Sequence, residues 1–202
     1  MKKIILLVSC ASMFIACIAP PDYEDLSSEL IVATNKDKAA DFKSYATFYV
    51  SDTIVNIGGE DQDTIWHDED ATQIVAGIKD NMQQRGYTYV QRHQNPDLAM
   101  AVGAIKILNV EYYPGWWGGY PGWFPGGFYP YYYPWSTVYA YNTGTMIIDT
   151  YDAKNAEANG QYRAVWNATS FGALGDSASG NINRVENAID QAFEQSPYFN
   201  AN

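Results

Sequence analysis

Carboxylates and a histidine crowd into residues 66–70, Trp66-His67-Asp68-Glu69-Asp70, the densest group of potential metal ligands in the chain. Zinc needs His or carboxylate ligands that converge from different parts of a fold, and calcium needs oxygens spaced along a turning loop. Neighbours in sequence seldom converge in this way. Carboxylates just before a helix and in its first turn are favoured by the helix dipole and accept its free amide protons. The pattern therefore predicts the start of a helix and no metal site.

Asp149 and Asp152 are the candidates for acid–base chemistry. Glycosidase chemistry requires two carboxylates that face each other across a cleft. Asp152 is expected to begin a turn, where Asp bonds its own backbone. Asp149 lies inside an expected strand, where an outward-facing position would explain it equally well. These residues leave a glycan-active hydrolase as an alternative function.

A nucleophilic serine would be the other route to hydrolysis. Residues 175–179, Gly-Asp-Ser-Ala-Ser, resemble a nucleophile elbow, but they lack the closing glycine and a strong strand leading in. A triad would have to recruit His67 or His93, the two histidines of the chain. The sequence therefore predicts a protein that is not an enzyme, with no catalytic residue and no cofactor.

The N-terminus predicts lipidation at Cys17. A short positive segment, Met1-Lys2-Lys3, precedes an apolar run over residues 4–16 that is shorter than the roughly 20 residues of a spanning helix. Ile15-Ala16-Cys17 then resembles the lipobox of bacterial lipoproteins, in which the cysteine carries fatty acids such as palmitate. Leu7-Val8-Ser9-Cys10 is an alternative, but cleavage there would leave a very short apolar core. We expect a signal peptide over residues 1–16 and Cys17 as the lipidated residue.

Charge and cysteine content limit the compartment and the partners. If Cys17 is the lipidated residue, Cys10 is removed with the signal peptide and the mature chain has no other cysteine. This excludes disulfides, a thiolate nucleophile and a Cys-based zinc site. The net charge of −11 and the pI of about 4.4 argue against nucleic acid as a partner. We expect an acidic tether over residues 17–29 and a protein held by lipid in the bacterial cell envelope. The outer membrane is the expected site, facing either the periplasm or the surface.

The first half of the folded part should contain strands and a helix. Strands are expected over residues 30–34, 46–50, 87–90 and 98–108, and residues 51–70 are polar. Asp70-Ala71-Thr72-Gln73 has the spacing of a capping box. Gly86 suits the residue after the helix, because glycine enters the left-handed conformation without a Cβ penalty. The expected buried stripe of this helix consists of Ile74, Val75, Ile78 and Met82.

The second half should contain a hairpin and a second helix. Residues 143–151 and 161–169 flank a polar turn, and Pro197 is expected to stop the helix. In the second strand, apolar residues alternate as expected for one buried face: Tyr162, Ala164, Trp166 and Ala168. The helix places four apolar residues on one side: Ile182, Val185, Ile189 and Phe193. The order predicts an α+β fold over residues 30–199, with an antiparallel or mixed sheet and two helices packed on one face.

Residues 111–135, called here the aromatic segment, interrupt this pattern before the C-terminal hairpin. Thirteen of these 25 residues are aromatic, and most others are Gly or Pro. They could pack over the sheet, form a recognition surface for sugars or proteins, or enter lipid headgroups. The sequence does not separate the first two. The candidate contact residues are Trp116, Trp117, Tyr120, Trp123, Phe124 and Trp135.

Several short motifs occur in an order that resembles the DUF4136 family of bacterial lipoproteins. They are Asp41-Phe42-x-x-Tyr45-x-Thr47-Phe48, Arg85-Gly86-Tyr87, Asn95-Pro96-Asp97-Leu98, Gly144-Thr145-x-Ile147-Ile148-Asp149-x-x-Asp152-Ala153 and Val165-Trp166. A Gly/Tyr/Trp-rich insert lies between the third and the fourth. The resemblance covers nearly the whole expected mature chain. It implies the fold and the location in the cell envelope, but no mechanism, because the family has no agreed activity.

The expected function is therefore non-catalytic binding or assembly in the cell envelope, with the aromatic segment as the contact surface. Expected partners are the membrane, through the lipid anchor, and a cell-wall glycan or another envelope protein. The alternatives are a hydrolase that uses the aromatic segment as a sugar platform, and a purely structural lipoprotein.

Overall fold

The computed structural model describes residues 30–57, 65–105, 110–111, 130–135, 140–141, 144–174 and 178–202. The predicted signal peptide, Cys17, Cys10, the predicted tether and most of the aromatic segment lie outside these residues. The strands are β1 (Ile31–Lys36), β2 (Thr47–Val50), β3 (Ile54–Ile57), β4 (Ile65–Trp66), β5 (Thr88–Tyr89), β6 (Leu98–Ile105), β7 (Val110–Glu111), β8 (Tyr131–Tyr132), β9 (Ala140–Tyr141), β10 (Thr145–Asp152) and β11 (Tyr162–Phe171). The helices are α2 (Glu69–Gln84), α3 (Ala156–Asn159) and α4 (Ala178–Glu194), with short 3-10 turns η1 (Phe42–Ser44) and η2 (Arg92–Gln94).

The α+β prediction is confirmed: nine strands form a mixed sheet in the order β1-β11-β10-β6-β2-β5, with β3, β4 and β8 joined at its sides. β10 and β11 form the predicted hairpin, β6 pairs antiparallel with β10, and β1 pairs antiparallel with β11. β2 and β3 both run parallel to β6. β3 was not predicted, because a short strand that is apolar at Ile54, Val55 and Ile57 lies in a region that is otherwise polar.

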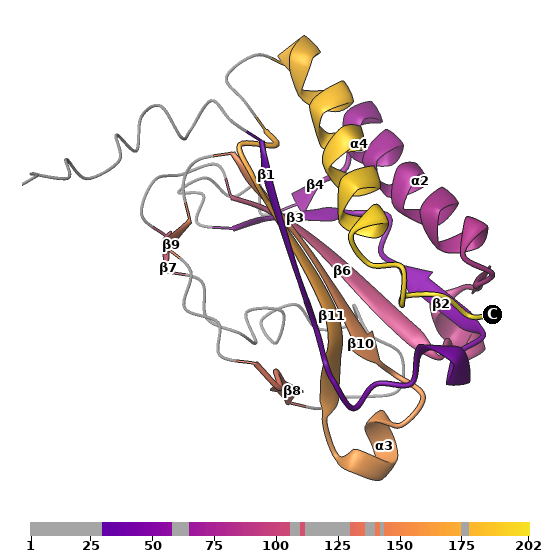
Figure 1. Ribbon diagram of the computed structural model, residues 1–202. Helices are drawn as coiled ribbons and strands as arrows, with labels where there is room; N and C mark the ends of the chain where they lie inside the picture. Colours follow the sequence, from indigo (N-terminus) through magenta and orange to yellow (C-terminus); the bar gives the residue numbers. More distant parts are fainter. Residues whose placement is uncertain are drawn as a thin grey trace, which may run out of the picture.

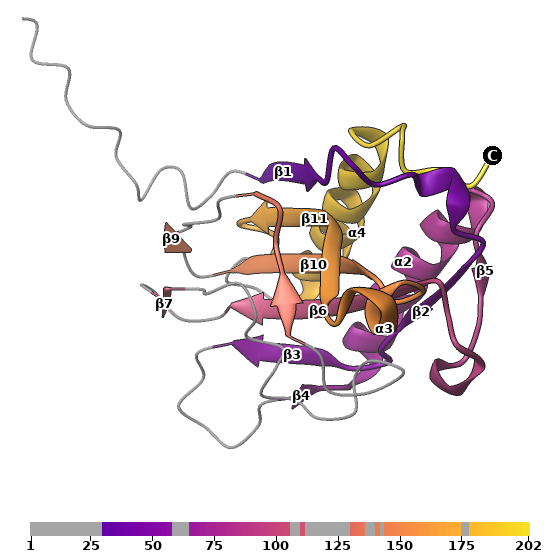
Figure 2. The same cartoon turned by 90° about the horizontal axis from the view of Figure 1, so that it is seen from below.

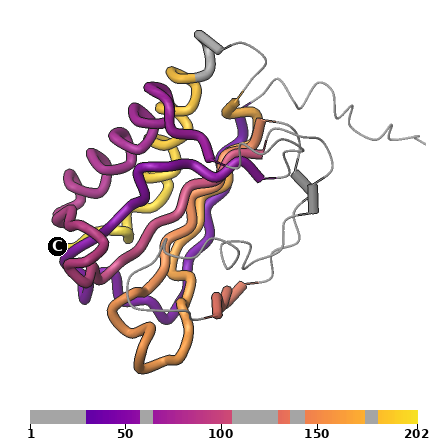
Figure 3. Tube along the Cα trace, turned by 180° about the vertical axis from the view of Figure 1, so that it is seen from behind, coloured from indigo at the N-terminus to yellow at the C-terminus, as the bar shows by residue number. Residues whose placement is uncertain are grey.

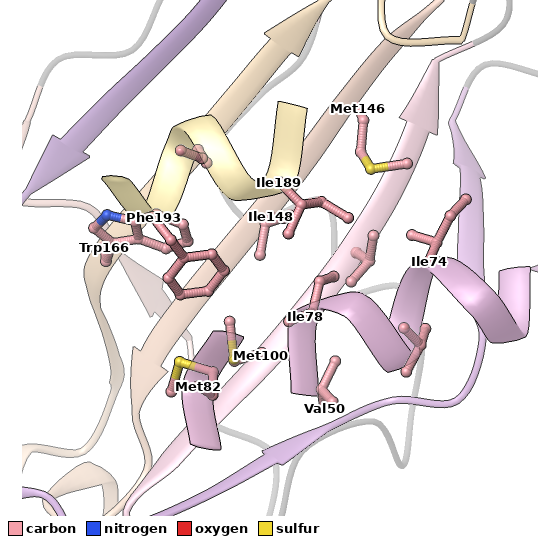
Figure 4. Close-up of a cluster of buried hydrophobic side chains, with 14 of the residues drawn as sticks. Val50, Ile74, Ile78, Met82, Met100, Met146, Ile148, Trp166, Ile189 and Phe193 are labelled. Carbon is pink, nitrogen blue, oxygen red and sulfur yellow. The ribbon is translucent and has the colours of Figure 1, made fainter. Parts of the chain in front are cut away.

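Helices α2 and α4 lie side by side on one face of the sheet, as predicted (Figure 1). Each helix turns one apolar stripe toward the strands, because residues three and four apart share a helix face. Ile74, Ile78 and Met82 of α2 and Ile189 and Phe193 of α4 meet the strands in the same core (Figure 4). Every one of these side chains is at most 1% exposed. Hydrophobic burial between the two layers is therefore the main stabilisation of the domain.

The start of α2 differs from the prediction. Asp68, not Asp70, is the N-cap residue, and its carboxylate accepts a hydrogen bond from the backbone N–H of Ala71 at 3.0 Å. Gln73 does not reach back to the cap but donates to Glu186 of α4 at 2.7 Å. Three carboxylates in a row satisfy the capping spacing equally well, and the packing of α2 on the sheet selects Asp68. The end of the helix is as predicted, with Gly86 at φ 89°.

A β-bulge corrects the expected pattern of β11. Thr150 pairs with Trp166 but the next residue, Tyr151, pairs with Ala164, so Val165 is an extra residue in the ladder. One extra residue inverts the side-chain alternation beyond it. Trp166 and Ala168 therefore face the helices, whereas Tyr162 and Ala164 face the opposite side of the sheet. The prediction that all four share one face is wrong.

The second face of the sheet carries its own apolar cluster, which includes Val55, Ile57, Ala101, Ile147 and Tyr151. None of these side chains is more than 1% exposed. Figure 2 shows β8 on this face, on the side of the sheet away from α2 and α4, and Figure 3 shows the same layers from behind. The end of the aromatic segment thus takes the place that a helix layer takes in a three-layer fold.

The C-terminal residues close the first core. The helix α4 ends at Glu194, just ahead of Pro197, and Phe199 then returns into the core with no exposed surface. Its ring centroid lies 4.9 Å from that of Phe42 and 5.1 Å from that of Trp166. The indole N–H of Trp166 donates to the Ser196 hydroxyl at 2.9 Å. The last residues are therefore part of the fold and not a tail.

Candidate functional site

Asp149 is fully buried on the second face of the sheet and forms the centre of a polar network. Tyr133 donates a hydrogen bond to its Oδ2 at 2.8 Å, and Tyr151 donates to the same oxygen at 3.2 Å. Asn167 donates to Oδ1 at 2.7 Å. The Tyr133 and Tyr151 hydroxyls are also in contact with each other. We call Asp149, Tyr133, Tyr151 and Asn167 the carboxylate network.

The sheet ladder positions three members of this network. β10 is regular against β6, so Asp149 and Tyr151, two residues apart, point to the same face. Asn167 stands directly opposite Asp149 on β11. Its amide oxygen accepts hydrogen bonds from Thr169 at 3.3 Å and Asn35 at 3.4 Å, which extends the network to β1. A buried carboxylate is tolerated here because several donors compensate for its lost hydration.

Tyr133, the fourth member, comes from the aromatic segment. Tyr131 and Tyr133 both point toward the sheet and pack on the second apolar cluster. Tyr131 meets Tyr151 edge to face, with ring centroids 5.1 Å apart, and stacks on Tyr162 at 5.7 Å. Burial and then the nearby Tyr162 raise the pKa of the Tyr131 hydroxyl above its usual range, so this ring is neutral at physiological pH. These rings fix the end of the aromatic segment to the sheet.

Tyr132, between them, has the opposite orientation. Strand alternation turns its ring outward, and 42% of the residue is exposed. The guanidinium carbon of Arg163 lies 5.1 Å from its ring centroid. Arg163 in turn forms an ion pair with Asp37, which is only 4% exposed. The surface therefore presents an aromatic ring beside an arginine that a buried carboxylate holds in place.

The predicted contact residues fall into two groups. Trp116, Trp117, Tyr120, Trp123 and Phe124 lie outside the described residues. Trp135 is partly buried against the second apolar cluster, with its ring edge to face with Tyr133 at a centroid distance of 5.9 Å. Its indole N–H is buried without a hydrogen-bond partner in the described part of the chain. Trp135 therefore belongs to residues 130–135, the end of the aromatic segment that is fixed to the sheet and is called here the anchored base.

The two candidate carboxylates of the sequence have separate surroundings. Asp152 points to the other face of β10 and accepts hydrogen bonds from the backbone N–H of Asn155 at 2.9 Å and from its amide at 2.7 Å. This is the turn role that was predicted for it. Asp149 accepts hydrogen bonds from two phenols and an amide.

The other candidate clusters serve the ends of helices. In residues 66–70, Asp68 accepts from the Trp66 indole at 2.6 Å as well as from Ala71, and His67 is exposed. Among the described residues no group of three or more His, Cys, Asp and Glu side chains is arranged to hold a metal ion. In the elbow-like stretch, Ala178 and Ser179 belong to the first turn of α4, and residues 175–177 lie outside the description.

Sequence reasoning missed the role of Asp97. Its Oδ2 accepts the backbone N–H of Ala46 at 2.7 Å and of Thr47 at 3.3 Å, while its own N–H donates to the Thr47 hydroxyl at 2.9 Å. Asp97 thereby joins the starts of β2 and β6. The signal was present in the Asn95-Pro96-Asp97-Leu98 motif, but nothing in the sequence named its partner 50 residues away.

The fold and these contacts define an α+β domain with helices on one face of a mixed sheet and aromatic residues on the other. The chain belongs to the DUF4136 family, described as a domain of unknown function, whose model matches residues 32–198. The resemblance drawn from the motifs is thus confirmed.

Among solved structures, a DUF4136 family protein from Bacteroides thetaiotaomicron is 32% identical with a TM-score of 0.70, and the match covers 86% of this chain and 98% of that one. This match supports a bacterial origin for the chain. A PelC dodecamer from Paraburkholderia phytofirmans is 14% identical with a TM-score of 0.41, covering 85% and 99% of the two chains. A PDZ domain protein from Parabacteroides distasonis is 14% identical with a TM-score of 0.44, covering 85% and 40%.

No curated protein matches the chain. Within the described residues, no helix is both long and apolar enough to cross a bilayer.

Proposed function

We propose that the protein is a lipid-anchored envelope protein with a non-catalytic binding or assembly role, and that the aromatic segment is its contact surface. The observation that carries this proposal is the anchoring of the segment's end. Tyr133 bonds to a fully buried carboxylate, and Tyr131 packs on the sheet, while Tyr132 between them faces out. A contact surface whose end is already fixed to the sheet loses less conformational entropy when it binds a partner.

The chemistry of the carboxylate network supports a structural role for Asp149. A general acid or base must reach the substrate, directly or through one water. Asp149 has no exposed surface and receives bonds from Tyr133, Tyr151 and Asn167. These bonds join Tyr133, which follows β8, and Asn167 of β11 to Asp149 of β10. No described contact specifically favours the hydrolase alternative.

The lipid anchor belongs to this proposal through its sequence signal. Ile15-Ala16-Cys17 follows an apolar run of signal-peptide length, and the acyl chains on Cys17 would hold the protein on a bilayer. Metabolic labelling of cells with a palmitate analogue tests this step. Wild type and the Cys10→Ala variant should be labelled, and the Cys17→Ala variant should not. Label that disappears with Cys10 instead would refute the assignment of Cys17.

The contact surface is tested by co-sedimentation of the full chain, in detergent, with purified cell-wall sacculi. The test variant replaces Trp116, Trp117, Tyr120, Trp123 and Phe124 with Ser and keeps the anchored base over residues 130–135. The matched control replaces Tyr49 and Tyr89, two half-buried tyrosines elsewhere, with Phe. We expect the wild type and the control to sediment and the serine variant to remain in solution while its melting temperature is unchanged.

Equal sedimentation of the wild type and the serine variant would reject these five residues as the contact. If none of the proteins sediments, the partner is not the cell wall. Crosslinking in cells from position 123 then tests for a protein partner, and the absence of any crosslinked product would reject the proposal as a whole.

A further inference from the structure

Cations gather at the end of the sheet where β1 stops. Lys36 and Lys38 lie in and after β1, Lys43 lies in η1, and Lys154 and Arg163 lie on either side of α3. Direct contacts join these segments, since Lys154 donates to the backbone oxygen of Ser44 at 2.8 Å and Arg163 pairs with Asp37. Lys154 also pairs with Asp97, whose Oδ1 lies 3.7 Å from its Nζ. We call these five cations the cationic end. It stands out because the whole chain carries a net charge of −11.

The carboxylates at this end are mostly turned inward. Asp37 and Asp152 are 4% and 5% exposed, and Asp97 is bonded to the backbone at the start of β2. The exposed acids of these segments are Asp41 and Glu157, against exposed Lys36, Lys38, Lys43 and Lys154. The accessible charge of this surface is therefore positive, although its total charge is balanced.

Arg163 is held in one orientation by Asp37. Its Nε–H donates to Oδ2 of Asp37, whose Oδ1 accepts the backbone N–H of Ala39 at 2.9 Å. That bond and the negative charge of Asp37 raise the pKa of Arg163, so the guanidinium keeps its charge. The side chain of Arg163 is 30% exposed and lies beside the outward-facing ring of Tyr132.

We propose that Tyr132 and Arg163, supported by the positive charge of Lys38 and Lys154 on the adjoining segments, bind an anionic polysaccharide whose sugar rings carry carboxylates. The guanidinium fork matches a carboxylate, because its donors lie in one plane. The exposed phenol ring offers a flat apolar face against which the C–H face of a sugar can pack. The flanking lysines suit a polymer, which brings a new negative charge with each repeat. The surface shares Tyr132 with the aromatic segment, but it does not use residues 116–124, and the cationic end is no part of the function proposed above.

The ligand class is tested by titrating the full chain with polygalacturonate at low salt, using calorimetry. Fully methyl-esterified polygalacturonate has the same rings without the charge, and polyglutamate has carboxylates without rings. Vesicles of phosphatidylglycerol present an anionic lipid surface. We expect polygalacturonate to bind at least about tenfold more tightly than each of the other three, and its binding to weaken at high salt as screening increases.

The site is tested with variants that keep the fold. Arg163→Lys retains a charge to pair with Asp37 but loses the planar fork, and Tyr132→Ala removes an exposed ring. Each should weaken polygalacturonate binding about fivefold or more. The matched control is Lys79→Gln on α2. Lys79 also pairs with an aspartate, Asp52 at 2.8 Å, and lies 4.5 Å from a tyrosine ring, Tyr89. The control should change the affinity less than about twofold.

The proposal is overturned if polygalacturonate does not bind, or if both site variants bind it like the wild type. It is also overturned if the methyl ester binds equally well, because the carboxylates are then not recognised. Equal binding of polyglutamate or of the vesicles would assign the surface to an acidic protein or a membrane instead. The five-serine variant keeps this surface and should bind polygalacturonate like the wild type, so the two proposals can fail separately.

Discussion

The hydroxyl of Tyr133 donates a hydrogen bond of 2.8 Å to the buried carboxylate of Asp149, 16 residues further along the chain. This bond joins the end of the aromatic segment to the centre of the sheet. Asn167, on the neighbouring strand, holds the other carboxylate oxygen. The aromatic segment therefore ends on a buried polar anchor as well as on apolar packing.

The first prediction concerns this bond. Tyr133→Phe removes the hydroxyl and leaves the ring, so the free energy of unfolding should fall by about 1.5–3 kcal/mol, the usual contribution of a hydrogen bond to a charged group. Tyr132→Phe removes an exposed hydroxyl from the adjacent residue and should change it by less than about 0.5 kcal/mol. Urea unfolding followed by fluorescence gives both values. Equal values for the two variants would show that the Tyr133–Asp149 bond is not an anchor.

The second prediction concerns the bulge at Val165. Deleting Val165 would leave the pairs Thr150–Trp166 and Tyr151–Ala164 in place and make the ladder regular, so Tyr162 and Ala164 would keep their face. We expect a cooperative thermal transition at a lower melting temperature, because the buried side chain of Val165 is lost. Deleting Ala168, in the regular part of the same ladder, would instead invert the side chains on one side of the deletion, and the cooperative transition should disappear. Equal melting curves for the two deletions would contradict the bulge.

The third prediction compares Gly77, inside α2, with Gly86, just after the C-terminal end of that helix. A Cβ at Gly77 would lie 4.0 Å from Ile189, an ordinary contact, so Gly77→Ala should stabilise the protein by up to about 1 kcal/mol through helix propensity. Gly86 has φ 89°, and a Cβ there would lie 2.6 Å from the Asn202 amide. Gly86→Ala should therefore destabilise by about 1–2 kcal/mol. Calorimetric melting should move in opposite directions, and a common direction would be inconsistent with this helix end.

The fourth prediction concerns Asp37 and pH. Burial tends to raise the pKa of Asp37, but the hydrogen bonds from Arg163 and the Ala39 N–H and the charge of Arg163 together lower it below the ordinary 3.8. A depressed folded-state pKa means that the stabilisation is fully present well above 3.8 and is lost as the pH falls through the folded value. Wild type should thus exceed Asp37→Asn in unfolding free energy at pH 6, and the difference should shrink toward pH 2.

Urea midpoints of the two proteins at both pH values measure this difference. Asp80→Asn, at an exposed position of α2, controls for the loss of a surface carboxylate. A wild-type advantage that is the same at pH 2 and pH 6 would mean that the ionised Asp37 does not stabilise the fold.

Periodicity predicted the framework well. The stripes of α2 and α4, the hairpin strands and the single helix-bearing face follow from residues that repeat at 3.6 or 2, and all of them appear in the structure. The helix end at Gly86 was predicted because its signal is a local backbone requirement. The N-cap was misassigned to Asp70, since adjacent carboxylates give the same local signal and only tertiary packing distinguishes them.

The site was less predictable. Trp135 and Asp149 were singled out by residue type and strand position, but Tyr133 is one aromatic residue among thirteen in its segment. Asn167 and Arg163 carried no distinguishing motif role at all. Their importance arises from partners 18 and 126 residues away, Asp149 and Asp37. Such pairings depend on strand register, which a single sequence does not specify across long separations.

By itself, then, the sequence determined the family, the two-layer framework and the unusual composition of the aromatic segment, because these depend on local order and residue type. The tertiary structure decided which face of the sheet the end of that segment covers, through the bond between Tyr133 and Asp149. It also inverted Tyr162 and Ala164 through the bulge at Val165, and it placed Arg163 between Asp37 and Tyr132. The physical reason is common to all three: each depends on which strands lie side by side and in what register, and that is fixed only when the whole sheet packs.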